Sequence, residues 1–208
     1  GATAVPLEAD EALVRTQETN LGNLVADVVR AAAGSQAAII NGGSIRRSIP
    51  AGTIRRSDIY RALPFDSYVV AMRLTGREIL EALEHGVSEV EKKAGRFPQV
   101  SGLTFTYDPK APPGMRIKEV WVAGKPLIPQ QEYTVATYDF LAAGGDGYLV
   151  FGRALGGKEG TLKIQELANH PKLVYNNPGR FIRDEVVAYL KTHPRLNPRS
   201  EGRIRVVK

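Results

Sequence analysis

Two short segments of the sequence carry side chains that suit a small anionic ligand. Residues 15–23 place Arg15 just before a predicted helix, and the free N–H groups and dipole of a helix N-terminus favour an anion. Residues 41–46, Asn-Gly-Gly-Ser-Ile-Arg, follow a short apolar run. Glycine there lets a ligand approach the backbone, Asn41 offers an amide, and Arg46 can bind phosphate through two hydrogen bonds. The two segments together indicate a phosphate-binding site.

A third segment, residues 138–148, adds an aromatic ring and a carboxylate. Phe140 begins a glycine-rich loop, and Asp146 in that loop could accept hydrogen bonds from two vicinal hydroxyls. Each feature alone has a simpler explanation, because Gly-Gly pairs usually make turns, arginines after turns are usually solvated and phenylalanines are usually core residues. In combination, arginines for phosphate, a carboxylate for ribose and an aromatic face for a base match the chemistry of a nucleotide.

No motif in the sequence is typical of a catalytic or metal centre. The chain has no cysteine and only three histidines, His85, His170 and His193, none with a second histidine or a spaced pair of carboxylates around it. Nucleophile-elbow and Walker-type phosphate motifs are also absent from the sequence. We therefore expect no catalytic residue, metal ligand or cofactor in this chain, and we interpret it as a binding module.

The composition is that of one globular domain. Of the 208 residues, 43% are hydrophobic and 24% are charged, and no apolar run of about 18 residues predicts a membrane span. The net charge of +6 is spread along the chain and only 7% of residues are aromatic, which favours small anions over polymeric nucleic acid. Nucleic-acid binding is therefore an alternative suggested by charge alone, and it predicts an affinity for DNA that falls steeply with added salt.

Apolar periodicity predicts alternating helices and strands. Asn20 is the expected N-cap of the first helix and Gly34 its stop. Helices are predicted at residues 21–33, 57–62 and 180–192, and after the capping box Thr75-Gly-Arg-Glu78. Strands are predicted at residues 37–40, 67–74, 102–107, 117–122, 133–138, 148–151 and 203–207.

This mixture of helices and hairpin-like neighbouring strands predicts an α/β fold of the α+β type. We expect a single domain, with a mixed β-sheet flanked by helices. The segment 152–177 is expected to be rich in loops.

Four motifs in order resemble the C-terminal, substrate-binding domain of the 5′-nucleotidase family of metallophosphoesterases. That family includes UDP-sugar hydrolases and 2′,3′-cyclic-nucleotide phosphodiesterases. The resemblance runs from about Arg15 to Phe151, returns at residues 201–204, and so covers most of the chain. Its motifs are Glu18-Thr-Asn-Leu-Gly-Asn-Leu24, Asn41-Gly-Gly-x-Ile-Arg46, Leu63-Pro-Phe65 and Phe140-Leu-Ala-x-Gly-Gly-Asp-Gly147.

The resemblance implies polar contacts between this chain and a nucleotide. Residues matching Arg15 and Arg46 contact phosphate or ribose in the family. The aspartate matching Asp146 binds the ribose hydroxyls, and the asparagine matching Asn41 contacts the ligand near the base. The implied ligand is a nucleoside or nucleotide.

The resemblance also implies an aromatic clamp. Rings matching Phe65 and Phe140 sandwich the nucleobase, and such stacking is largely blind to base identity. Gly43 and Gly145 are expected to keep the backbone of the pocket close and bent. The sequence departs from the family pattern at Ser44, where many members carry a third glycine; its side chain either narrows the pocket or adds a hydrogen bond.

The family's N-terminal domain has no counterpart in these residues. That domain carries two divalent metal ions and the catalytic His–Asp pair, and the C-terminal domain rotates against it to deliver the substrate. We therefore expect residues 15–208 to be the substrate-binding domain, residues 1–14 to be a remnant of the interdomain linker, and the isolated chain to be inactive. The implied enzyme is a periplasmic, secreted or cell-surface hydrolase of nucleoside 5′-phosphates.

Two further interpretations come from another functional class. The chain is either a non-catalytic binding module that has lost its pocket, or the equivalent domain of a relative that acts in sulfur oxidation. The presence of Phe65, Phe140 and Asp146 argues against a lost pocket.

Overall fold

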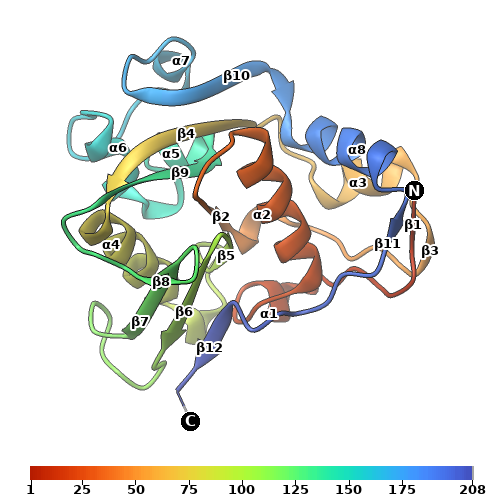
Figure 1. Ribbon diagram of the computed structural model, residues 1–208, viewed down its shortest axis with the longest axis horizontal. Helices are drawn as coiled ribbons and strands as arrows, with labels where there is room; N and C mark the ends of the chain where they lie inside the picture. The colour runs from red at the N-terminus through yellow and green to blue at the C-terminus, as the bar shows by residue number, and fades with distance from the viewer. Residues whose placement is uncertain (208) are drawn as a thin grey trace.

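A five-stranded mixed sheet forms the centre of the molecule (Figure 1). The computed structural model describes residues 1–207. In the order β10-β4-β9-β2-β5, only β2 and β9 pair in parallel, and the other neighbours are antiparallel. The predicted α/β fold with a mixed sheet is thereby confirmed. The five strands are β2 (Ala37–Asn41), β4 (Tyr68–Thr75), β5 (Pro98–Ser101), β9 (Glu132–Tyr138) and β10 (Leu173–Phe181).

Two smaller sheets flank the central one. In the first, β1 (Ala2–Thr3) lies between β11 (Arg195–Leu196) and β3 (Gly52–Thr53), so the first residues of the chain pair with a segment near its end. Leu7 is fully buried. The second, with the order β12-β6-β7-β8, contains β6 (Leu103–Tyr107), β7 (Ile117–Val122), β8 (Lys125–Pro126) and β12 (Ile204–Val206).

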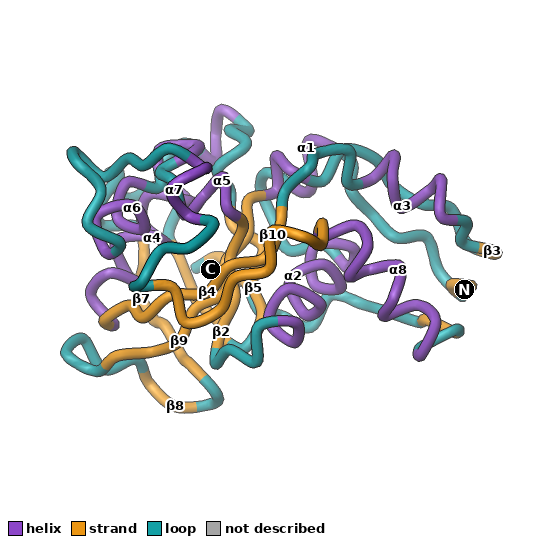
Figure 2. The backbone as a smooth tube through the Cα atoms, turned by 90° about the horizontal axis from the view of Figure 1, so that it is seen from above, coloured by secondary structure: helices purple, strands orange, loops and turns teal. Residues whose placement is uncertain are grey.

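The helices that cover the sheets form two groups at opposite ends of the molecule. Figure 2 shows α3 and α8 at the end that holds the N-terminus, and α4, α6 and α7 at the opposite end. Thr75 and Glu78 form the predicted capping box of α4, each side chain bonding the backbone N–H of the other residue. The helices are α1 (Glu11–Val14), α2 (Asn20–Ala32), α3 (Arg56–Ala62), α4 (Gly76–Val87), α5 (Asp139–Ala142), α6 (Leu149–Ala154), α7 (Ile164–Leu167) and α8 (Ile182–Thr192).

The predicted strand at residues 148–151 is wrong, because this segment begins helix α6. Tyr148 and Phe151 are both fully buried and stack at a ring-centroid distance of 5.2 Å, which suits the i, i+3 spacing of a helix. A short run that is apolar on all sides does not distinguish a buried strand from a buried helix.

Three other boundaries differ from the sequence-based prediction. Thr19, rather than Asn20, caps α2, because its hydroxyl accepts the N–H of Gly22. The last helix begins at Ile182, since the residues before it belong to the edge strand β10, which tolerates Pro178. The segment 152–177 contains α7 and the start of β10, so it is less irregular than expected.

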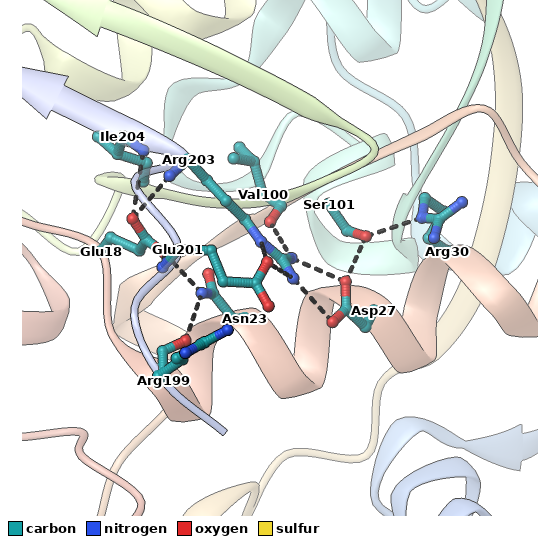
Figure 3. Close-up of polar contacts among 10 residues, drawn as sticks. All are labelled: Glu18, Asn23, Asp27, Arg30, Val100, Ser101, Arg199, Glu201, Arg203 and Ile204. Carbon is teal, nitrogen blue, oxygen red and sulfur yellow. Dashed lines mark hydrogen bonds and ion pairs between the residues drawn. The ribbon is translucent and has the colours of Figure 1, made fainter. Parts of the chain in front are cut away.

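A buried polar network attaches the C-terminal segment to α2 (Figure 3). Both carboxylate oxygens of Asp27 accept hydrogen bonds from the guanidinium of Arg203, at 2.7 and 2.9 Å, and Glu201 accepts from the same group at 2.8 Å. Arg203 also donates to the carbonyl of Val100 at 2.9 Å. The buried carboxylate of Glu18 accepts the backbone N–H groups of residues 201 and 203. The chain end is thus held by side chains as well as by β12.

Replacing Arg203 with alanine should lower the free energy of unfolding by about 2 kcal/mol. The change leaves the buried carbonyl of Val100 without the donor Arg203 and removes the ion-pair partner of Asp27 and Glu201. Because both carboxylates are partly exposed, water stabilises them after the change, and the loss of stability is smaller than for a fully buried ion pair. Urea unfolding followed by circular dichroism measures the difference. Arg205→Ala, an exposed position, is the matched control and should change stability by no more than about 0.5 kcal/mol. Equal losses in both variants would contradict the network's role.

Candidate functional site

The end of β2 runs directly against another stretch of backbone. Gly42 donates its N–H to the carbonyl of Phe97 at 2.7 Å, and Gly43 donates to the carbonyl of Gly95 at 2.8 Å. A Cβ at position 42 would lie 2.1 Å from the carbonyl oxygen of Val14, and one at position 43 would lie 2.8 Å from the Cα of Gly95. Only glycine allows this approach, which is the close, bent backbone predicted for Gly43.

Asn41 is the last residue of β2, and both the nitrogen and the oxygen of its side-chain amide form hydrogen bonds within the protein. Its Nδ2 donates to Asp146 Oδ2 at 2.6 Å, and its Oδ1 accepts the hydroxyl of Ser44. A carboxylate only accepts, so the contact with Asp146 fixes which way the amide points. Ser44 therefore adds a hydrogen bond, which is one of the two outcomes left open by the sequence, and it also lines the cavity described below.

Asp146 is held by its backbone as well as by Asn41. It lies in the short 3₁₀ turn Gly145–Gly147 with φ of 52°, in the left-handed region. Its carbonyl accepts a hydrogen bond from Nε2 of His85 at 2.8 Å, and a carbonyl can only accept, so His85 carries its proton on Nε2. Burial lowers the pKa of His85 below its ordinary value of 6.5. His85 thus supports the loop as a neutral imidazole.

Phe65 and Phe140 lie beside the ends of two neighbouring strands of the central sheet. Phe65 precedes the start of β4 and Phe140 follows the end of β9, and these strand ends lie together because Val69 pairs with Tyr138 in the antiparallel ladder. Their side chains remain exposed, to 52% for Phe65 and 38% for Phe140, although both are large and apolar. Two exposed phenylalanines that line one cavity form a candidate binding surface.

Hydrogen bonds fix the positions of both aromatic loops. The carboxylate of Asp139, which is 3% exposed, accepts the backbone N–H of Tyr68 at 3.3 Å and so joins the start of β4 to the start of α5. Burial raises the pKa of Asp139. Arg183 of α8 donates to the carbonyls of Pro64 and Phe65 at 3.2 Å. The spacing of the two phenylalanine loops is therefore set by the folded protein.

Gly145 lies beneath the ring of Phe140. A Cβ at this position would lie 2.6 Å from two ring carbons and from the carbonyl oxygen of Phe140. Any larger residue would displace the ring, so Gly145 supports Phe140 from below.

Arg15 and Arg46 approach the same region from separate loops. Arg15 forms an ion pair with Glu11 at 2.7 Å, and Arg46 donates to the carbonyl of Gly43 at 3.1 Å. The loop that carries Arg15 is held by Gln99, whose buried amide donates to the carbonyls of Val14 and Gln17 at 3.0 and 2.7 Å. Each guanidinium keeps donors that these contacts leave unused.

These segments enclose a cavity of about 430 Å³. Seven of the eight predicted site residues line it, and Gly145 is the one that lies outside the lining. The lining also contains Ser44, which the sequence marked as a departure from the family pattern, and five residues that were not predicted as site residues, of which Asp139 lies in the segment 138–148 already singled out. The predicted residues in the lining are Arg15, Asn41, Gly43, Arg46, Phe65, Phe140 and Asp146, and the missed ones are Asp66, Ser67, Gly95, Asp139 and Ile164.

The cavity contains no arrangement suited to a metal. Among residues 1–207, no group of three or more histidine, aspartate or glutamate side chains is placed to hold a metal ion. The same residues include no helix long and apolar enough to cross a membrane.

Comparison with known families matches residues 1–153 to the description "5′-nucleotidase, C-terminal domain". The chain belongs to the 5′-nucleotidase C-terminal domain family. The trifunctional nucleotide phosphoesterase protein YfkN of Bacillus subtilis is 42% identical over 168 residues, which is 76% of this chain and 12% of that protein. The family assignment confirms the resemblance inferred from the four motifs.

Two solved structures show how this chain compares in three dimensions. A 5′-nucleotidase precursor from Thermus thermophilus matches the whole chain with a TM-score of 0.86 at 37% identity, over 39% of its own length. The sulfate thiohydrolase SoxB of Thermus thermophilus matches the whole chain with a TM-score of 0.69 at 22% identity, over 34% of its length. The second likeness concerns the fold alone. The chain thus spans well under half the length of these relatives.

Acidification should destabilise the protein through His85. The pKa of His85 is lower in the folded chain than in the unfolded one, so the unfolded state takes up the proton first. Stability is therefore fully present above the unfolded pKa of about 6.5, falls as the pH drops below it, and levels off below the folded pKa. Urea unfolding at a series of pH values between about 8 and 5 measures this.

His85→Gln is the matched comparison for this pH dependence. Its amide can still donate to the carbonyl of Asp146 but does not titrate, and contributions from other groups cancel in the difference between the two proteins. The parent should lose stability relative to His85→Gln across the window. If the free energy of unfolding varied with pH in the same way for the two proteins, the prediction would be wrong.

Proposed function

We propose that this chain binds a nucleoside or nucleotide in the cavity between Phe65 and Phe140. The observation that carries the proposal is the meeting, in one cavity, of two exposed phenylalanines, a paired Asn41 and Asp146, and two arginines with unused donors. Each group suits one part of a nucleotide, and the family assignment adds support.

The proposed pose follows from the chemistry of each wall. The base stacks between Phe65 and Phe140, which accept any base because every base presents a π-face. The free carboxylate oxygen of Asp146 accepts hydrogen bonds from the ribose hydroxyls, beside the amide of Asn41. Arg15 and Arg46 bind the phosphate through charge-assisted hydrogen bonds. Gly43 and Gly145 leave room for the ligand and for the ring of Phe140.

In the complete protein, we propose that this domain presents nucleoside 5′-phosphates to a hydrolytic centre. That centre belongs to an N-terminal metallophosphoesterase domain outside these residues, where two divalent metal ions would activate a water molecule. Residues 1–14 would be the remnant of the linker to it, and residues 15–208 the substrate-binding domain. The setting proposed for such an enzyme is the periplasm, the cell surface or the outside of the cell. The names of the relatives YfkN and 5′-nucleotidase precursor support the hydrolase class.

The cavity does not favour the alternative functions. The likeness to SoxB is one of fold, whereas Phe65, Phe140 and Asp146 line one cavity, which supports the nucleotide proposal. A chain that had lost its pocket would bind AMP equally well after Phe140→Ala. Binding of DNA, the third alternative, would weaken steeply as salt is added, and the proposal expects no such response.

Removing a stacking ring should weaken binding of every nucleoside. Phe65→Ala or Phe140→Ala should cost about 1–3 kcal/mol of binding free energy with adenosine, AMP and UMP alike. Isothermal titration calorimetry measures the loss. Trp121→Ala, which removes an exposed aromatic side chain from β7, is the matched control and should leave affinity unchanged.

Arg46→Ala should weaken binding of AMP more than binding of adenosine, because only AMP carries the phosphate that Arg46 is proposed to hold. The same titrations measure both affinities, and Arg73→Ala, an exposed arginine on β4, controls for net charge. Equal losses for the two ligands would contradict the phosphate role. Unchanged affinity for both would remove Arg46 from the site.

The isolated chain should release no phosphate from AMP, with or without added divalent metal ions. The reason is that residues 1–207 bring together no cluster of metal-ligating side chains. A phosphate-release assay across Mg²⁺, Mn²⁺ and Zn²⁺ measures this, and an Arg46→Ala sample purified in parallel identifies contaminating phosphatase. Metal-dependent release that is lost with Arg46→Ala would overturn the prediction.

A further inference from the structure

A second and larger cavity adjoins the proposed nucleotide site. Its volume is about 580 Å³, and its walls come from the start of α1, the loop after β2 and the end of α3. We call it the outer cavity. Arg46 lines both this cavity and the nucleotide pocket, so the two spaces are joined at that guanidinium. Its lining residues are Ala9, Asp10, Glu11, Arg46, Arg47, Ser48, Ile49, Pro50, Asp58 and Arg61.

The three carboxylates of the outer cavity already have partners within the protein. Asp10 caps α1 by accepting the N–H of Ala12 at 2.9 Å. Glu11 is paired with Arg15 at 2.7 Å. Asp58 accepts the N–H of Arg55 at 2.8 Å in the capping box of α3. These carboxylates thus bind backbone N–H groups at helix N-termini and a neighbouring arginine.

The arginines of the outer cavity, unlike its carboxylates, have few partners within the protein. The side chains of Arg47 and Arg61 form no hydrogen bond or ion pair with any other residue between positions 1 and 207. Arg46 uses one donor on the carbonyl of Gly43 and retains the others. Arg47 and Arg61 are exposed to solvent, so the charged groups of this cavity that have no protein partner are cationic, although equal numbers of acidic and basic side chains line it.

Backbone and side-chain hydrogen bonds hold the walls of the outer cavity together. Arg46 donates its N–H to the carbonyl of Ala62 at 2.8 Å, which fixes the loop after β2 against the end of α3. Ser48 accepts the N–H of Ala9 at 2.8 Å and so fixes the same loop against the segment before α1. Ile49 is 2% exposed and anchors the loop in the core. The arginines therefore extend from a rigid frame.

We propose that the outer cavity is a second phosphate-binding site, formed by Arg47 and Arg61 with Arg46 at its border. The two guanidinium groups supply planar pairs of donors, which match the oxygens of a phosphate group. Two sources fit this chemistry: the distal phosphate of a nucleotide whose first phosphate lies at Arg15 and Arg46, or free inorganic phosphate. The first source rests on the proposed nucleotide function, whereas the second is independent of it.

The site is tested on the whole chain by NMR and calorimetry. The Nε–H signals of the arginines are followed while inorganic pyrophosphate is added, and shifts are expected at Arg47 and Arg61 as well as at Arg15 and Arg46 of the first cavity. Calorimetry then compares ADP with AMP, and ADP should bind about tenfold more tightly because it places one more phosphate among arginines. Arg47→Ala/Arg61→Ala should abolish this difference and leave AMP affinity within about twofold of the parent.

Arg73→Ala/Arg77→Ala is the control double variant. Both residues are exposed, so it removes the same charge from another part of the surface and should preserve the preference for ADP. Equal affinity for AMP and ADP, together with pyrophosphate shifts at Arg47 and Arg61, would assign the site to free phosphate. Pyrophosphate shifts without any AMP or adenosine binding would refute the nucleotide function and leave the second site standing.

Two results would overturn the proposal of a second phosphate site. The first is the absence of pyrophosphate shifts at Arg47 and Arg61 together with equal affinity for AMP and ADP. The second is a set of shifts of similar size at Arg73 and Arg77, which would show that phosphate contacts any exposed arginine.

Discussion

Three stretches of backbone meet at Gly42 and Gly43, and the binding cavity depends on that contact. The carbonyl of Val14 and the backbone around Gly95 both lie where a side chain at these positions would be. Because no Cβ intervenes, the end of β2 forms hydrogen bonds with the turn before β5, and the carbonyl of Val14 in the loop that carries Arg15 packs against Gly42. A larger residue at either position would separate the arginines from the Asn41–Asp146 pair.

Much of the candidate site could be predicted from the sequence because its chemistry is concentrated in short motifs. Asn41 and Asp146 stand beside glycines, and those local signals survive without knowledge of the fold; Arg15 was predicted as the residue before a helix, although it is the C-cap of α1 and α2 is capped four residues later at Thr19. Asp139 and Ile164 could not be found this way. Asp139 matters through a hydrogen bond to Tyr68, and Ile164 reaches the cavity from α7, so both depend on tertiary contacts.

The fold was predictable where one face of an element is apolar and the other polar, as in α2 and α4. It was not predictable for a short run without such a polar face. Residues 148–151 are mostly apolar, so only packing of Tyr148 on Phe151 selects a helix. The cap of α2 failed for another reason: the side chain of Asn20 bonds the N–H of Glu8 and the carbonyl of Pro6, which leaves Thr19 to cap the helix.

The left-handed backbone at Asp146 has a consequence for protein engineering. A residue other than glycine with φ of 52° carries conformational strain, here on the carboxylate that closes the pocket. Glycine would relieve that strain, but it would also remove the acceptor for the buried amide of Asn41, and the lost hydrogen bond opposes the gain. A library at position 146 selected for thermal stability alone therefore weighs backbone strain against the hydrogen bond to Asn41, and aspartate persists only where the second effect is the larger.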